Sequence, residues 1–198
     1  MKVGIIGMGP VGMTLAVKLK QTGYDVIICE KDKTKLSQIL ENGITLEGLI
    51  KATSEFDKGY SSINEMIYNE SEFDCLLFSL KSYQLKEAAV EANNLINKKL
   101  TIISAQNGID VEEILSAIFG SSQILRLVLN FAGNLSALNK VNVTFFNRPN
   151  YIGSIDNNRT DQAISFANKL TEVDLDTENV DSLGITKKIW EKTILNSA

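Results

Sequence analysis

A glycine-rich turn near the N-terminus constrains the fold more than any other feature of this sequence. The β-branched run Val3–Ile6 predicts a strand, and apolar residues at helical spacing up to Gly23 predict a helix. Between them the chain reads G-M-G-P-V-G, a spacing that lets the backbone approach a pyrophosphate at a helix N-terminus. We therefore expect a dinucleotide site formed by six consecutive residues: Gly7, Met8, Gly9, Pro10, Val11 and Gly12.

The residues after the second predicted strand bear on the form of the dinucleotide. Tyr24–Cys29 is an apolar run that predicts a buried parallel strand, and Glu30 follows it, eighteen residues after Gly12. A carboxylate at this spacing can accept hydrogen bonds from both ribose hydroxyls of NAD and repels a 2′-phosphate. The lysine cluster that begins at Lys31 would instead attract the 2′-phosphate of NADP. NAD and NADP therefore both remain open, as does an ordinary charged helix start.

The rest of the chain continues to alternate between apolar runs and helical patterns. Further strands are predicted at 74–80, 100–104, 124–129, 141–146 and 151–153, and further helices at 34–42, 84–96, 111–119, 161–170 and from 182 onward. Ile44–Tyr60 fits short extended segments or a hairpin better than a helix. The pattern predicts an α/β protein with a doubly wound, mostly parallel, Rossmann-type sheet that binds ligands at the carboxyl ends of its strands.

Composition excludes several classes of function. The net charge is −4, so a broad cationic surface for nucleic acid is not expected. The chain has no histidine and only two cysteines, both in apolar runs, which excludes Ser-His-Asp hydrolysis and gives no expectation of a metal site. The N-terminal apolar run is broken by glycine after four residues, too early for a signal sequence or a membrane span. A cytoplasmic protein that contacts neither membrane nor nucleic acid is the expectation.

Three further motifs in the sequence, taken together, point to a particular protein family. They are Ser79-Leu80-Lys81-Ser82-Tyr83-Gln84 and Gln106-Asn107-Gly108, each after a predicted strand, and Trp190-Glu191-Lys192-Thr193-Ile194-Leu195-Asn196 in the last helix. Together with the glycine-rich turn, and in this order, they resemble the ketopantoate reductase (2-dehydropantoate 2-reductase) family over essentially the whole chain. The resemblance implies that the protein reduces a small 2-keto acid, most simply ketopantoate, with NADP(H) in pantothenate synthesis.

The resemblance also implies a role for each of four residues. Lys192 would be the catalytic acid that delivers a proton to the substrate carbonyl oxygen. Lys81 would lie beside the cofactor, Asn107 beside both cofactor and substrate, and Asn196 would hydrogen-bond the substrate. Lys192 and Asn196 are four residues apart, so a helix places them on one face. A lysine whose pKa is lowered by burial and cationic neighbours can act as an acid near neutral pH.

The last predicted helix divides the chain into two parts. We expect residues 1–178 to form the dinucleotide-binding domain and residues 179–198 to be the first helix of an all-α domain that is otherwise missing. Ile185, Ile189, Trp190 and Ile194 would then form an apolar face without a cover from this chain. The expectation is therefore a helix that is disordered or packed against another chain, in a homo-oligomer for example, and a chain that binds dinucleotide but catalyses poorly.

Two alternatives stay open at this stage. An NAD-dependent 2-hydroxyacid dehydrogenase of the same family is favoured by Glu30. A non-catalytic dinucleotide-sensing module would share the opening strand–turn–helix unit. Such a module has no reason to carry Lys81, Asn107 and Lys192, which separate the two classes.

Overall fold

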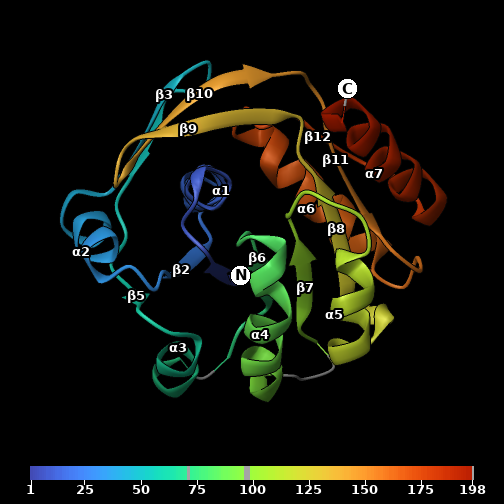
Figure 1. The fold of residues 1–198 in the computed structure, drawn as a ribbon, viewed down its shortest axis with the longest axis horizontal. Helices are drawn as coiled ribbons and strands as arrows, with labels where there is room; N and C mark the ends of the chain where they lie inside the picture. Colours follow the sequence, from blue (N-terminus) through green and yellow to red (C-terminus); the bar gives the residue numbers. More distant parts are fainter. Residues whose placement is uncertain (71, 96–98, 198) are drawn as a thin grey trace.

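The apolar runs near the N-terminus pair as parallel strands, as their pattern predicts. In the computed structural model, which describes residues 1–70, 72–95 and 99–197, they lie in a sheet that has eight strands among those residues (Figure 1). Its order is β12 (Thr177–Asn179), β11 (Asn150–Ser154), β8 (Ile124–Val128), β7 (Thr101–Ser104), β6 (Cys75–Phe78), β1 (Lys2–Ile6), β2 (Asp25–Cys29) and β5 (Gly59–Tyr60). All neighbours pair in parallel except β8 and β11, and the order from β5 to β8 is that of a Rossmann sheet. The predicted fold class is confirmed.

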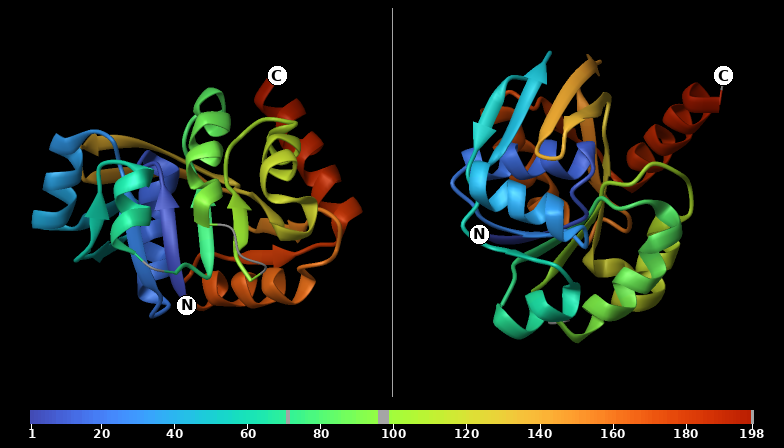
Figure 2. Two further views of the ribbon diagram at one scale, coloured as in Figure 1. Left: turned by 90° about the horizontal axis from the view of Figure 1, so that it is seen from below. Right: turned by 60° about the vertical axis from the view of Figure 1, so that its left-hand side comes forward.

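Helices cover both faces of this sheet because side chains along each strand alternate between two apolar layers. In β1, for example, Ile5 packs in the layer of α1 (Pro10–Gln21) and α6 (Thr160–Glu172), and Ile6 packs in the opposite layer. The opposite layer contains α3 (Ile63–Asn69), α4 (Ser82–Ala92) and α5 (Val111–Phe119). Figures 1 and 2 show these two groups of helices on opposite sides of the sheet. The helix α2 (Lys33–Asn42) ends at Gly43, as predicted.

A second, four-stranded sheet covers α1 on the side away from the main sheet (Figure 1). Its order is β4 (Ala52–Ser54), β3 (Ile44–Gly48), β10 (Lys140–Phe146) and β9 (Phe131–Ala137). The antiparallel pair β3–β4 confirms the predicted hairpin. The strand β9 was not predicted, because only its first residue is buried and its apolar signal is correspondingly weak.

Several other elements differ from the sequence-based expectation. The predicted helix 84–96 begins earlier, at Ser82, and its α-helical part ends at Ala92, followed by a 3-10 turn over Asn93–Leu95; Ile96 lies outside the described residues. A second 3-10 turn, Ser121–Gln123, precedes β8. The short elements α3 and β12 were not predicted, since seven and three residues are too few for a periodic signal.

The last helix, α7 (Ser182–Ser197), is partly covered by its own chain. Ile185 and Ile189 are buried against Val128 and are packed by Tyr151 and Val180, so α7 lies along β8 and β11. The expectation of one uncovered apolar face is therefore wrong for these two isoleucines. The expectation of an uncovered face is correct for Trp190 and Ile194, which follow along α7 and are 52% and 64% exposed. Among the described residues, no helix is both long and apolar enough to span a bilayer.

Candidate functional site

The glycine-rich turn has the backbone geometry that its sequence predicts. Gly7 has a φ of +97°, which favours glycine, and its N–H donates to the Cys29 carbonyl at 2.9 Å, which ties the turn to β2. A Cβ at Gly12 would collide with the Gly7 carbonyl oxygen, so only glycine permits this approach of helix to strand. At Gly9 a Cβ would meet no heavy atom within 4 Å, which leaves the backbone open to a ligand at the N-terminus of α1.

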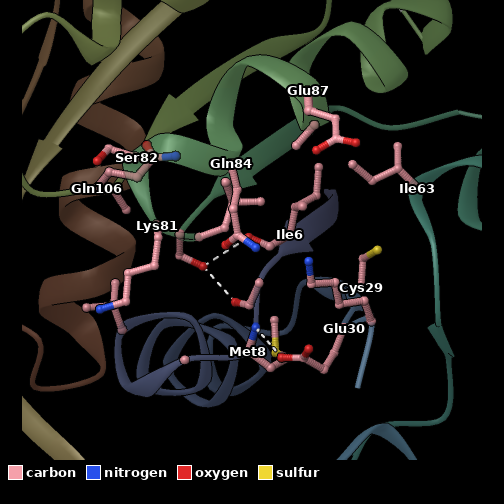
Figure 3. A pocket seen from close by; sticks show the side chains of 18 of the residues that line it. Ile6, Met8, Cys29, Glu30, Ile63, Lys81, Ser82, Gln84, Glu87 and Gln106 are labelled. Atoms are coloured by element: carbon pink, nitrogen blue, oxygen red, sulfur yellow. Dashed lines mark hydrogen bonds between the residues drawn. The ribbon is translucent and has the colours of Figure 1, made fainter. Parts of the chain in front are cut away.

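A cavity of about 620 Å³ opens along the carboxyl ends of the parallel strands. Candidate cofactor-binding residues line it at the ends of four strands. They are the turn after β1, Glu30 after β2, Lys81 after β6 and Asn107 after β7. Figure 3 shows Lys81 and Glu30 on opposite sides of the turn that carries Met8. Of the ten predicted cofactor residues, nine line this cavity: Gly7, Met8, Gly9, Pro10, Val11, Glu30, Lys31, Lys81 and Asn107. Gly12 lies behind them and is buried.

Three side chains near the turn and the Asn107 loop were not singled out from the sequence. Ser79 donates from Oγ to the Gly7 carbonyl at 2.8 Å, so the end of β6 braces the turn. Arg126, 2% exposed, donates to Ser104 Oγ at 2.7 Å and to the Gly108 carbonyl at 2.9 Å, which holds the loop that follows Asn107. Ser104 in turn donates to Gln106 Oε1 at 2.7 Å. A charged residue inside an otherwise apolar strand was the signal that could have identified Arg126.

Gln106, which lines the cavity, has a buried side-chain amide nitrogen without an acceptor in the described part of the chain. Its side chain is 5% exposed, and its Nε2 has no hydrogen-bond partner among the described residues. A buried amide donor without a partner costs free energy, so a bound acceptor such as a phosphate or carboxamide oxygen would relieve that cost. Together with the open backbone at Gly9, this donor fits a dinucleotide in the cavity.

Lys192 does not line the cavity, and its hydrogen bond places it at the carboxyl end of a neighbouring strand. From α7 its Nζ donates to the carbonyl oxygen of Leu129, the residue after Val128 at the carboxyl end of β8. That strand pairs in parallel with β7, which carries the Asn107 loop at the same edge. Burial, and then the charge of Arg126, lowers the pKa of Lys192 to about 8. This lysine can therefore exchange a proton near neutral pH.

Asn196 was predicted to hydrogen-bond the substrate. Asn196 follows Lys192 by one turn of α7, as expected, but its side chain lies outside the described part of the chain.

Both cysteines are buried and unpaired, and burial raises the pKa of Cys29 to about 12 although it lines the cavity. Cys29 is therefore an apolar wall of the cavity and not a nucleophile at neutral pH.

Comparisons with known proteins identify similar sequences and structures, most of them described as ketopantoate reductases. The family model described as ketopantoate reductase PanE/ApbA matches residues 3–157. A 2-dehydropantoate 2-reductase of Streptococcus pyogenes is 22% identical over 196 residues, which cover 99% of this chain and 61% of the relative. The solved 2-dehydropantoate 2-reductase of Geobacter metallireducens superimposes with a TM-score of 0.81 at 22% identity over 99% of this chain and 62% of that one. D-mandelate dehydrogenase, solved with NADH and anilino(oxo)acetate, gives a TM-score of 0.83 at 21% identity over 99% and 61%. The chain thus spans about three fifths of these relatives.

Proposed function

Because the chain belongs to the ketopantoate reductase family, we propose that it takes part in the NAD(P)H-dependent reduction of a small 2-keto acid, most simply ketopantoate. The observation that carries the proposal is the convergence of the open turn at Gly9, Lys81 and Asn107 on one cavity at the carboxyl ends of the strands. Ligands of open α/β sheets bind at this edge. Residues 1–178 would bind the dinucleotide, and residues 179–198 would begin a separate helical part.

Each side chain then has a distinct task in the proposed reaction. The dihydronicotinamide, when bound, supplies a hydride to the carbonyl carbon of the substrate. Lys192 donates a proton from Nζ to the carbonyl oxygen, which becomes the hydroxyl of the product. The neutral Lys192 amine then takes up a proton from solvent. Asn107 would lie beside both reactants, Lys81 beside the cofactor, and Asn196 would hydrogen-bond the substrate. The lowered pKa of Lys192 supports its part in this scheme.

The pH dependence of the rate follows from that pKa. Since the acid must be protonated, we expect the reduction rate to be nearly constant below the pKa of Lys192, about 8, and to fall about tenfold per pH unit above it. The reverse oxidation, which needs the neutral amine as a base, should rise over the same range. Initial rates in both directions between about pH 6 and 10 measure this. A reduction rate that is flat across this range would exclude Lys192 as the acid.

An NAD-dependent 2-hydroxyacid dehydrogenase is the second candidate. It is supported by Glu30 at the ribose corner of the cavity and by the similarity in fold to D-mandelate dehydrogenase with NADH. The two candidates differ in substrate and in cofactor, not in the residues that would perform the step. Oxidation of NADH and of NADPH by ketopantoate and by an aryl 2-keto acid, measured in parallel, tests both. Failure of the chain to bind either cofactor would reject both candidates.

A further inference from the structure

The carboxylate of Glu30 is already engaged by the protein at the corner where a ribose is expected. Its Oε2 accepts from the Met8 N–H at 3.2 Å, the contact drawn in Figure 3, and its Oε1 accepts from the Asp32 N–H at 3.0 Å. Lys35, in the first turn of α2, places its Nζ 3.3 Å from Glu30 Oε2 and 3.4 Å from the Met8 carbonyl oxygen. Glu30 thus joins the glycine-rich turn to α2 through three donors.

These contacts limit what Glu30 can offer a ligand. A carboxylate has about four acceptor sites, so three donors leave too few for two ribose hydroxyls unless one donor moves away. The Glu30 and Lys35 side chains are only 12% and 14% exposed, so solvent screens their ion pair less than a surface pair. Lys35 therefore largely cancels the negative charge that would otherwise repel a 2′-phosphate.

The other charges around this corner do not substitute for Lys35. Lys31 lines the cavity but is exposed, and Lys33 is exposed on α2. Across the cavity, Glu87 and Glu91 of α4 also line the wall and add negative charge. With the Glu30 carboxylate uncancelled, these carboxylates and that of Asp32, which caps α2 beside Glu30, would all oppose a 2′-phosphate.

We propose that Lys35, although it lies outside the cavity lining, determines whether the cavity accepts a 2′-phosphorylated dinucleotide, by neutralising Glu30. With Lys35 in place the cavity binds both NADPH and NADH. Without it, the uncancelled carboxylate weakens the binding of NADPH and leaves that of NADH nearly unchanged. This inference rests on the proposed dinucleotide site, and it resolves the conflict between the acidic and basic signals in the sequence at 30 and 31.

The first test is Lys35→Met, which keeps the length of the aliphatic side chain and removes its charge. We expect NADPH to bind at least about tenfold more weakly and NADH to change by less than about threefold, because only the 2′-phosphate faces the uncancelled carboxylate. Isothermal titration calorimetry with NADPH and NADH gives both constants on the isolated chain. Lys33→Met is the matched control, since it removes an exposed lysine from the same helix, and it should leave the ratio of the two constants unchanged.

The second test separates neutralisation from direct contact with the phosphate. In a Glu30→Gln background there is no charge to cancel, so adding Lys35→Met should weaken NADPH binding by less than about threefold. A tenfold loss in that background would show that Lys35 contacts the phosphate, and it would overturn the proposal. So would an unchanged NADPH to NADH ratio in Lys35→Met. If the unmodified chain binds neither nucleotide, the proposed function itself fails, a result distinct from these two.

Discussion

In a protein extended to the length of the relatives, replacing Lys192 with alanine is expected to slow reduction of the 2-keto acid by about 10²–10⁴-fold, the usual contribution of a positioned proton donor. Binding of the dinucleotide should stay within about threefold of the unmodified chain, because Lys192 lies outside the cavity lining and bonds to the Leu129 carbonyl. Turnover from nicotinamide absorbance and affinity from calorimetry, on the same preparations, give the two numbers. Loss of turnover together with intact binding would identify a group that acts on the chemical step.

Lys187→Ala is the matched control for this prediction. Lys187 lies on the same helix, is 76% exposed and forms a distant ion pair with Glu191, at 3.9 Å. We expect its removal to leave turnover within about twofold, since an exposed pair of this kind contributes little. A loss below about tenfold in Lys192→Ala would assign proton delivery to another group, with Lys81 as the next candidate.

Replacing Gly9 with aspartate is expected to abolish dinucleotide binding, with at least about a 100-fold loss for both NADH and NADPH. The carboxylate would lie where the backbone is open to the pyrophosphate, and it would repel that anion. The fold should tolerate the change, because Gly9 has a φ of −73° and a Cβ there meets no heavy atom within 4 Å. Gly9 is also the N-cap of α1, a position where aspartate stabilises helices.

Gly9→Asn is the control of equal size, and it separates charge from bulk. Its loss of affinity should be smaller than that of Gly9→Asp, while both variants should unfold at or above the temperature of the unmodified chain. Thermal unfolding by circular dichroism and titration calorimetry cover both points. Unchanged affinity in Gly9→Asp would remove the glycine-rich turn from the binding site.

Much of the fold was predictable because its signals are local. Val3–Ile6 and Tyr24–Cys29 read as buried strands since parallel strands covered on both faces are continuously apolar. The helix at 111–119 was predicted with its observed bounds, and its N-terminal and C-terminal neighbours Asp110 and Gly120 both have positive φ. The strand β9 could not be found in this way, because it is exposed along most of its length and exists through its pairing with β10.

The candidate cofactor residues came from two sources. Glu30 was predicted from its spacing after the second strand, and Lys81 and Asn107 from the resemblance to a family. All three line one cavity, because the residues that follow parallel strands meet at one edge of the sheet. The face that α7 presents could not be assigned, since periodicity does not tell which part of an apolar helix finds a neighbour. In the structure Ile185 and Ile189 pack on β8 and β11, and Trp190 faces outward.

The sequence by itself determined the doubly wound sheet, the glycine-rich turn and the set of polar residues at the strand ends, because strand and helix periodicity and glycine requirements act over a few neighbouring residues. Only the tertiary structure decided the state of charge within the site. Lys35 meets Glu30, and Arg126 lies near enough to Lys192 to lower its pKa, through the folding of separate elements against one another. Coulomb interactions depend on distance in space and on burial, and neither quantity is set by separation along the chain.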